Sequence, residues 1–260
     1  TGLTRMVSAY VENPSGHGAE DMKYRFRWPA PNLLSPHDPK TLYHAANVVF
    51  RSNDGGATWT AISPDLTRDD KSRQRWSGGP ITGDNTTAEF YCTLSALAES
   101  PKEKEVLWAG SDDGLVHLSR DGGKTWKNLS ANLPGLPEWA TIFMIEPSSF
   151  DSAAAYLVVD AHLLDDFHPY VYRTKDHGAS WTKISDSLPQ DVPARVVRHD
   201  PAAKGLLYLG TDRGVMISRD DGESWTELRL NLPTVPVNDQ IVKGDESVVG
   251  TLGRSLWILD

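Results

Sequence analysis

One octet occurs four times in the chain, and it limits the folds that the chain can adopt. The copies begin at Ser52, Ser119, Thr174 and Ser218 and share the pattern Ser/Thr-x-Asp-x-Gly-x-Ser/Thr-Trp. Four matches to five constrained positions are not a chance event, and such self-similarity marks a repeat architecture. The Asp, Gly and Trp positions of the octets are Asp54, Gly56, Trp59, Asp121, Gly123, Trp126, Asp176, Gly178, Trp181, Asp220, Gly222 and Trp225.

Each octet lies between short runs that are typical of strands. Before the second copy, residues 106–110 and 115–118 flank Asp113-Gly114, a dipeptide that favours a tight hairpin turn. A short run at 127–129 follows the octet, and a further run at 93–98 precedes the hairpin. The unit is therefore four short antiparallel strands with the octet in the turn between the third and fourth. No long helical periodicity is present, so an all-β fold is predicted.

The octet residues are interpreted as a folding device. An Asp carboxylate accepts hydrogen bonds from backbone N–H groups of its own turn, and Gly gives the turn the backbone freedom it needs. The Ser or Thr hydroxyl bonds locally, and the Trp covers the junction with a large apolar surface. We prefer this interpretation to four calcium or ligand sites.

Composition excludes several classes of protein. The chain has 260 residues with a formal net charge of -9, which argues against a general attraction to nucleic acid. No run approaches the roughly 18 apolar residues of a membrane helix, so membrane insertion is not expected. Cys92 is the only cysteine, which excludes an internal disulfide and a cysteine-based zinc site. Thr1 to Tyr10 carries no apolar stretch of the kind that a signal peptide needs.

The octets resemble Asp-boxes, also called BNR repeats, which mark β-propellers of the sialidase, xyloglucanase and sortilin (VPS10) types. The resemblance is strongest to large bacterial proteins with a sortilin-like propeller, and it is carried by residues 13–18, 83–86, 108–114 and 253–257. It implies a bacterial source and a secreted or periplasmic location.

The predicted architecture is a β-propeller of four-stranded antiparallel blades with the octets in the 3–4 turns. About five blades fit the chain, approximately at residues 24–62, 90–129, 139–184, 194–228 and 237–260. Residues 1–260 then form a single propeller domain or the C-terminal part of a larger ring, since propellers close with four to eight blades. We expect the larger ring, in which this chain contacts further blades or domains of a longer parent chain.

Strand order separates the two faces of such a propeller. The 1–2 and 3–4 turns share one face, named here the octet face, and the 2–3 and 4–1 loops share the other, the loop face. Two long segments, 63–89 and 161–169, are predicted on the loop face, where binding residues are expected because long loops on rigid scaffolds carry function. The candidate ligand-binding residues are His17, Trp76, Asp84, His162, Arg213 and Arg254.

Two functions remain open at this stage. The first is a non-catalytic, sortilin-like binding propeller that captures a peptide, a protein segment or a glycan on the loop face. The alternative is a carbohydrate-active hydrolase of the xyloglucanase type, or a fragment of one. That alternative needs two carboxyls, for which Asp84, Asp165 and Asp166 are candidates, and aromatic platforms, for which Trp76, Trp139, Phe167 and Tyr170 are candidates. No catalytic motif transfers residue by residue, and a sialidase is disfavoured because its start motif and a third arginine are absent.

Metal sites are weaker alternatives. His162, Asp165, Asp166 and His168 could ligate a metal together if their loop curls, and calcium could bind Asp112 and Asp113 or Asp165 and Asp166. A polar loop tip explains the same residues, so we expect no metal and no cofactor, with calcium kept as the alternative.

Overall fold

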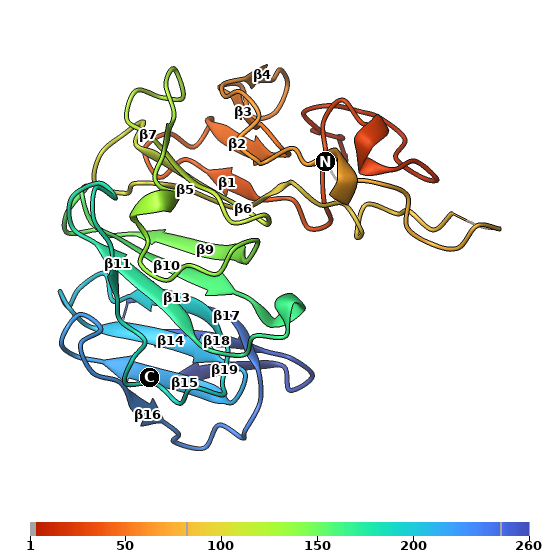
Figure 1. Ribbon diagram of the computed structural model, residues 1–260. Coiled ribbons are helices and arrows are strands. Elements are labelled where there is room, and N and C mark those ends of the chain that lie inside the picture. Colours follow the sequence, from red (N-terminus) through yellow and green to blue (C-terminus); the bar gives the residue numbers. More distant parts are fainter. Residues whose placement is uncertain (1–3, 82, 245, 260) are drawn as a thin grey trace.

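The computed structural model describes residues 4–81, 83–244 and 246–259, and it is an all-β molecule of five antiparallel sheets (Figure 1). The first sheet contains β1 (Asn32–Leu34), β2 (Leu42–Ala45), β3 (Val49–Ser52) and β4 (Thr60–Ala61). The second contains β5 (Leu94–Glu99), β6 (Leu107–Ser111), β7 (Val116–Ser119) and β8 (Lys127–Asn128). The third contains β9 (Thr141–Pro147), β10 (Ala155–Asp160), β11 (Tyr170–Thr174) and β12 (Thr182–Lys183).

The fourth sheet contains β13 (Ala194–His199), β14 (Leu207–Thr211), β15 (Gly214–Ser218) and β16 (Thr226–Leu228). The fifth contains β17 (Val237–Lys243), β18 (Glu246–Thr251) and β19 (Leu256–Leu259), so among the described residues it has three strands instead of four. Four short 3₁₀ turns interrupt the loops: η1 (Ala19–Asp21), η2 (Lys71–Arg73), η3 (Ser130–Asn132) and η4 (His162–Leu164). Within the described ranges, no helix has the length and apolar character to cross a membrane.

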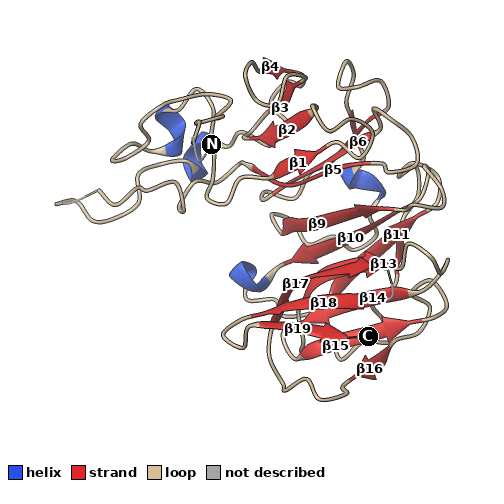
Figure 2. Ribbon diagram, turned by 180° about the vertical axis from the view of Figure 1, so that it is seen from behind, coloured by secondary structure: helices blue, strands red, loops and turns tan. Residues whose placement is uncertain are grey.

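The sheets follow one another in chain order along an arc, as Figures 1 and 2 show from opposite sides. The strands β1, β5, β9, β13 and β17 contact one another in succession and form the inner layer of this arc. The first and fifth sheets stand at its two ends. The predicted β-propeller with octets in the 3–4 turns is confirmed. Residues 24–28, included in the first predicted blade, are not in a strand, because the first sheet begins at Asn32.

All four octets form the same hydrogen-bonded turn. In the first, Asp54 Oδ1 accepts the N–H groups of Ala57 and Thr58 at 2.9 Å each, and Oδ2 accepts the Thr58 hydroxyl at 2.7 Å. The Ser52 hydroxyl donates to Asp54 at 2.8 Å and accepts the Gly56 N–H at 2.8 Å. The equivalent carboxylate contacts are made by Asp121, Asp176 and Asp220. The predicted role of these residues in the turn is thus observed directly.

The octets also join neighbouring sheets. Gly123 lies against the preceding sheet so closely that an added Cβ would stand 2.7 Å from the Ile62 carbonyl oxygen. The Trp126 indole N–H donates to that same carbonyl at 3.0 Å. The same joint recurs two sheet pairs further on, between Gly222 and Trp225 of the fourth sheet and Ile184 of the third. The second and fourth octets therefore fix the end of the previous sheet.

At the first sheet, the N-terminal segment occupies the equivalent place. A Cβ added to Gly56 would lie 2.9 Å from the Cβ of Val7, where the later octets meet Ile62 or Ile184. The Arg5 guanidinium donates to the Gly55 carbonyl at 3.2 Å. Val7 therefore substitutes for the apolar residue that a preceding sheet supplies elsewhere.

The apolar core lies in layers between consecutive sheets. The layer between the second and third sheets contains Trp108 and Tyr172, and the next contains Leu207 and Leu209, all fully buried. Cys92 is also fully buried, as expected for a small core residue.

Candidate functional site

The loops segregate onto two faces as strand order predicts. In the second sheet, the Gly122 N–H of the octet donates to the carbonyl of Glu105, between β5 and β6, at 3.0 Å. At the other end, the Asp112 N–H, between β6 and β7, donates to the carbonyl of Thr93, just before β5, at 2.9 Å. Both long segments therefore lie on the loop face. Figure 1 shows residues 62–93 projecting from it in gold, and η4 beside β10 in green.

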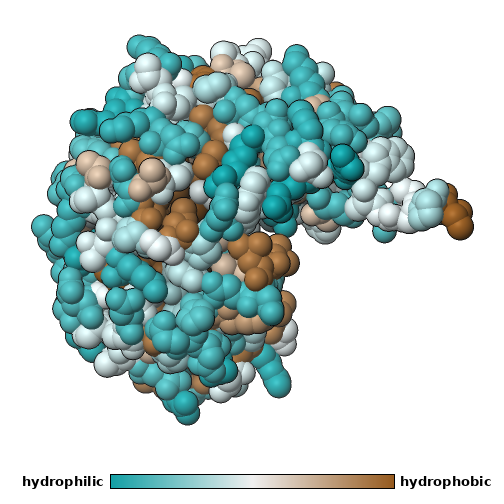
Figure 3. Space-filling model, viewed as in Figure 1, coloured by the Kyte–Doolittle hydropathy of each residue, from teal (hydrophilic) through white to brown (hydrophobic). Residues whose placement is uncertain are grey.

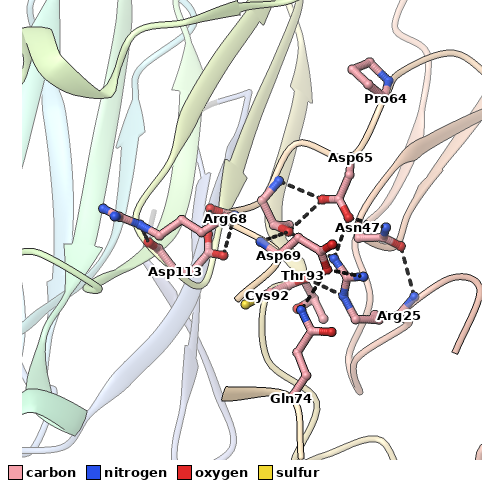
Figure 4. A network of polar contacts seen from close by, with 12 residues as sticks. Arg25, Asn47, Pro64, Asp65, Arg68, Asp69, Gln74, Cys92, Thr93 and Asp113 are labelled. Atoms are coloured by element: carbon pink, nitrogen blue, oxygen red, sulfur yellow. Dashed lines mark hydrogen bonds and ion pairs between the residues drawn. The ribbon is translucent and has the colours of Figure 1, made fainter. Parts of the chain in front are cut away.

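A buried arginine ties the projecting segment to the sheets (Figure 4). The Arg25 side chain is 2% exposed, and its Nε donates to the Cys92 carbonyl at 3.0 Å. Its Nη2 bonds Asp65 at 2.6 Å, and its Nη1 lies 3.0 Å from Asp69. Asn47 of the first sheet accepts the Arg25 N–H and donates to Asp65. One guanidinium thus links the N-terminal segment, the first sheet and both ends of the projecting segment.

Two adjacent carboxylates in the 2–3 loop of the second sheet are fully buried. Asp112 accepts the N–H of Thr93 at 2.8 Å and its hydroxyl at 2.7 Å, and lies 3.4 Å from Arg27. Burial raises the pKa of Asp112 to about 7. Asp113 accepts the N–H of Arg68 at 2.8 Å and the Ser111 hydroxyl at 2.5 Å. The strands on both sides enclose Asp112 and Asp113, so neither carboxylate is exposed to solvent.

A second charged cluster lies at the same level of the third and fourth sheets. Asp160, at the end of β10, contacts His162 Nδ1 at 2.7 Å and Arg195 Nη1 at 2.7 Å. Arg195 also binds Asp212 through Nε at 2.7 Å and Nη2 at 3.0 Å. One guanidinium therefore holds two carboxylates from neighbouring sheets.

The tip of the 161–169 loop is internally bonded. Asp166 contacts His168 Nδ1 at 2.7 Å and accepts the Tyr170 hydroxyl at 2.7 Å. Partial burial raises the pKa of Asp166, but the bonds from Tyr170 and His168 outweigh it and the net shift is downward. Asp165 is exposed, with a left-handed backbone at φ 61°. In the described part of the chain, no three His, Cys, Asp or Glu residues are placed to hold a metal ion, so the ligand set proposed for this loop is not assembled.

The inner strands of four sheets carry a β-bulge at the same position. The extra residues, which have no partner in the adjacent strand, are Ser95, Phe143, Arg195 and Asn238. A bulge re-aims its side chain, and bulges are over-represented near functional sites. At the loop-face end of the inner layer, the fold therefore presents a hydroxyl, an aromatic ring, a guanidinium and an amide in equivalent positions.

The candidate ligand-binding residues fall into separate groups. His17, Trp76 and Asp84 lie in one corner, because the Gly16 N–H bonds the Asn85 carbonyl and the Asp84 N–H bonds the Ser77 carbonyl. Trp76 is 52% exposed, and one part of its ring packs on Gly83 and Gly18. His17 and Asp84 are exposed. His162, Arg213 and Arg254 stand on the 2–3 loops of the third, fourth and fifth sheets.

The two predicted anion-binding arginines differ in their surroundings. Arg213 binds Asp191 at 2.8 Å and lines a cavity of about 220 Å³ with Leu188, Val192 and Met216. The Arg254 side chain is exposed, and its carbonyl accepts the Trp257 indole N–H at 2.9 Å. The charge of Arg213 is thus paired with a carboxylate of a neighbouring loop, whereas no such pair is found for Arg254 among the described residues.

Of the four predicted aromatic platforms, two are accessible and two are covered by other side chains. Trp76 and Phe167 are half-exposed, whereas Tyr170 is hydrogen-bonded to Asp166 and packed beneath Lys183. Trp139 does not present an open ring, because the guanidinium groups of Arg68 and Arg73 lie 4.4 Å and 4.0 Å from its centroid.

Exposed apolar side chains were missed by sequence reasoning. Trp28 and Leu163 are about three-quarters exposed, and Phe143 is 39% exposed on the bulge of β9. Figure 3 shows such apolar surface in brown on the concave side of the arc and at the tip of the projecting segment. The Tyr-Arg-Phe-Arg-Trp run at 24–28 could have signalled Arg25 and Trp28, since alternating cations and rings are unusual in a surface loop. The bulge at Phe143 has no signal in the sequence.

Comparison with known proteins supports the propeller fold. No model of a known protein family matches the chain. Vacuolar protein sorting/targeting protein 10 of Laccaria bicolor is 32% identical over 109 residues, which is 41% of this chain and 7% of that protein. The oligoxyloglucan-reducing end-specific xyloglucanase of Emericella nidulans is 24% identical over 232 residues, which is 75% of this chain and 25% of that enzyme.

Among solved structures, the GH74 xyloglucanase of Xanthomonas campestris superposes with a TM-score of 0.64 at 15% identity. The match covers 86% of this chain and 35% of the enzyme. At this identity the likeness shows the fold. The chain is a β-propeller similar to both the VPS10 and the xyloglucanase types, as its octets indicated, and it spans a quarter or less of the two curated relatives.

Proposed function

We propose that this protein is a binding propeller that captures a glycan chain on its loop face. The observation that carries the proposal is a contrast among the described side chains of that face. Several of its aromatic and apolar side chains are exposed, namely Trp76, Phe143, Leu163 and Phe167, whereas most of its carboxylates are buried or bonded to neighbouring cations. Such a surface is suited to holding a sugar, because ligand sites combine apolar and aromatic contacts with a few placed polar groups.

The exposed rings give the ligand its apolar contacts. Trp76 and Phe167 come from the two long loop-face segments, and Phe143 comes from the inner strand between them in sequence. His162 has its Nδ1 bonded to Asp160, which leaves Nε2 as its remaining polar atom for a ligand hydroxyl. Rings of this kind are rigid and large, so they provide contact area at low entropic cost.

The state of the carboxylates favours capture over catalysis. Glycoside hydrolysis in most families needs an acid and a second carboxylate on either side of the scissile bond. Asp160 and Asp212 share the Arg195 guanidinium, and Asp112 has a raised pKa but is enclosed. The catalytic candidates Asp84 and Asp165 are exposed on different loops, and Asp166 is bonded to His168 and Tyr170.

A hydrolytic role is the second candidate, and it is supported by the xyloglucanase relatives. Because this chain spans 25% of one such enzyme and 35% of another, it would form one wall of a cleft completed by further blades. Peptide capture of the sortilin type is the third ligand class, supported by the VPS10 likeness. An exported location in a bacterium, and partners other than nucleic acid, belong to the same proposal.

Further blades are proposed at both ends of the arc. Val7 already covers Gly56 where a preceding sheet belongs. At the opposite end, Leu256 and Ile258 of the outermost strand β19 are largely exposed. The exposed side chains of β19 support packing against an additional sheet, whereas at the first sheet a further blade would have to include the segment that carries Val7.

The test is affinity electrophoresis and calorimetry with xyloglucan and other neutral and acidic polysaccharides, with a peptide library in parallel. We expect a glycan to bind, and W76A with F167A to weaken that binding at least tenfold. F150A is the matched control, since Phe150 lies in the 1–2 loop of the third sheet on the octet face. Binding of peptides alone would contradict glycan capture. Release of reducing sugar that is lost in D84N or D165N would establish the hydrolase instead.

A further inference from the structure

Two successive 4–1 loops meet at one indole ring on the loop face. The projecting segment supplies Arg68 and Arg73, and the loop between the second and third sheets supplies Trp139. The Arg73 guanidinium lies 4.0 Å from the ring centroid and that of Arg68 lies 4.4 Å from it. Two positive charges therefore lie over one ring, and an oxyanion that contacts either guanidinium is attracted by both.

Arg68 is fixed in place by the buried second sheet. Its backbone N–H donates to Asp113 Oδ2 and its Nε donates to the Asp113 carbonyl, both at 2.8 Å. Asp113 is fully buried, so its two hydrogen bonds hold Arg68 on a rigid support, called here the Asp113 pedestal. The nearest carboxylate to the Arg68 Nη atoms is that of Glu138, at 3.5 Å from Nη1, and the Glu138 side chain is 71% exposed.

Arg73 is positioned by η2. The Asp70 carboxylate accepts the Ser72 N–H at 2.9 Å, and the Arg73 N–H donates to the Asp70 carbonyl at 3.0 Å. The closest approach between the charged groups of Arg73 and Asp70 is 3.6 Å, which is longer than a hydrogen bond. The Arg73 side chain is 46% exposed. The N–H donors of Arg73 are therefore accessible to a ligand while its guanidinium lies over the Trp139 ring.

The N–H donors of a guanidinium lie in one plane and point outward in pairs. This geometry matches a carboxylate or a similar oxyanion, which can accept two parallel hydrogen bonds. The ion pairs of these arginines with Glu138 and Asp70 are long, at 3.5 Å and 3.6 Å, so a ligand oxyanion that makes shorter bonds can replace them. Lys71 is bonded to Asp69 at 2.9 Å and is not part of the pair. The chain as a whole has a net charge of -9, so attraction of an anion here would come from these two arginines and not from the overall charge.

We propose that Arg68 and Arg73, stacked on Trp139, bind the carboxylate or sulfate group of an acidic glycan. The inference rests on the proposed glycan capture and names the class of sugar. The positive charge of these arginines attracts the acidic group, while Trp76 and Phe167 contact the neutral parts of the chain.

The experiment compares polygalacturonate with its carboxyl-reduced form, and dextran sulfate with dextran, by calorimetry on the whole chain. We expect binding of at least one acidic polymer, at least tenfold stronger than its neutral counterpart and weakening with added salt. R73Q and R68Q should each reduce this binding about tenfold. R120Q is the matched control, because Arg120 is exposed in the second octet on the opposite face.

The readouts separate the two proposals. Equal binding of acidic and neutral polymers, or equal losses in R120Q and R73Q, would overturn the charge site and leave glycan capture standing. Failure of every polysaccharide would overturn both. Because R68Q could disturb the Asp113 pedestal, melting temperature is recorded for each variant, and R73Q decides the outcome if R68Q is unfolded.

Discussion

The two faces of this propeller are built on different principles. On the octet face, one turn is repeated four times with the same carboxylate contacts, each between residues at most four positions apart. On the loop face, the contacts of Arg25, Asp112 and Arg195 occur once each and join distant parts of the chain. Arg25, for example, bonds a carbonyl 67 residues away.

This difference shows which parts of the structure depend on local sequence and which depend on long-range packing. An octet carboxylate forms its hydrogen bonds within its own turn, so its geometry can be inferred from the eight residues of the octet. The buried charges of the loop face, such as Arg25 and Asp112, are balanced only after separate segments of the chain have assembled. We therefore expect the loop face to be more sensitive to single substitutions, although the octets are more regular.

The strongest test of the comparison is Arg25→Met. Removing this guanidinium leaves the Asp65 carboxylate without its cation and the Cys92 carbonyl without its donor, while Asp69 keeps its contact with Lys71. Breaking a fully buried charge network costs about 3–5 kcal/mol, but the Asp65 and Asp69 side chains are 30% and 42% exposed, so we expect a loss of about 3 kcal/mol. The free energy of unfolding, measured by urea denaturation, should fall by that amount.

Arg254→Met is the matched control, since Arg254 is exposed on the same face. We expect its effect to stay within about 0.5 kcal/mol. An Arg25 variant as stable as the Arg254 variant would show that the network does not support the fold.

The same contrast explains what could be predicted from the sequence. The octet turns and the assignment of the two faces followed from local patterns and strand order. The enclosure of Asp112 did not, because it depends on Thr93 and Arg27, which are remote in sequence. The covering of Trp139 by Arg68 and Arg73 was missed for the same reason, since the three residues meet only when adjacent sheets pack.

A second test uses the pH dependence of stability. The folded-state pKa of Asp112 is raised to about 7 by burial, from an ordinary value of 3.8. Between these values the unfolded chain releases the proton and the folded chain keeps it. The free energy of unfolding should therefore fall as pH rises from about 4 to about 7 and then level off.

Asp112→Asn removes the titrating group, so the variant should lack this part of the decline. The comparison is the difference between the two unfolding curves at each pH, which cancels the contributions of other groups. A difference that does not change with pH would mean that Asp112 does not keep its proton in the folded state. Asp121→Asn on the octet face should leave the pH 4–7 range unchanged, because hydrogen bonds from Thr125 hold the Asp121 pKa at about 2.

The smallest and sharpest test compares one glycine from each face. Gly123 in the second octet has φ 92° and would place a Cβ 2.7 Å from the Ile62 carbonyl oxygen, whereas Gly135 in the loop between β8 and β9 has φ 63° and open space around it. Gly135→Ala should cost about 1–2 kcal/mol, for the left-handed backbone alone. Gly123→Ala should cost about 1–3 kcal/mol more, because the joint to the first sheet must open to admit the methyl group.

The difference between these two variants measures the octet as a joint between sheets, apart from its role as a turn. If both glycines cost the same, the octet is only a turn, and its regularity reflects local hydrogen bonding. If Gly123→Ala costs more, each octet also anchors the sheet before it, and the repeated face supplies the rigid frame on which the irregular loop face is held. The contact of Val7 with Gly56 then has the same meaning, since the N-terminal segment completes the joint for which no preceding sheet is described.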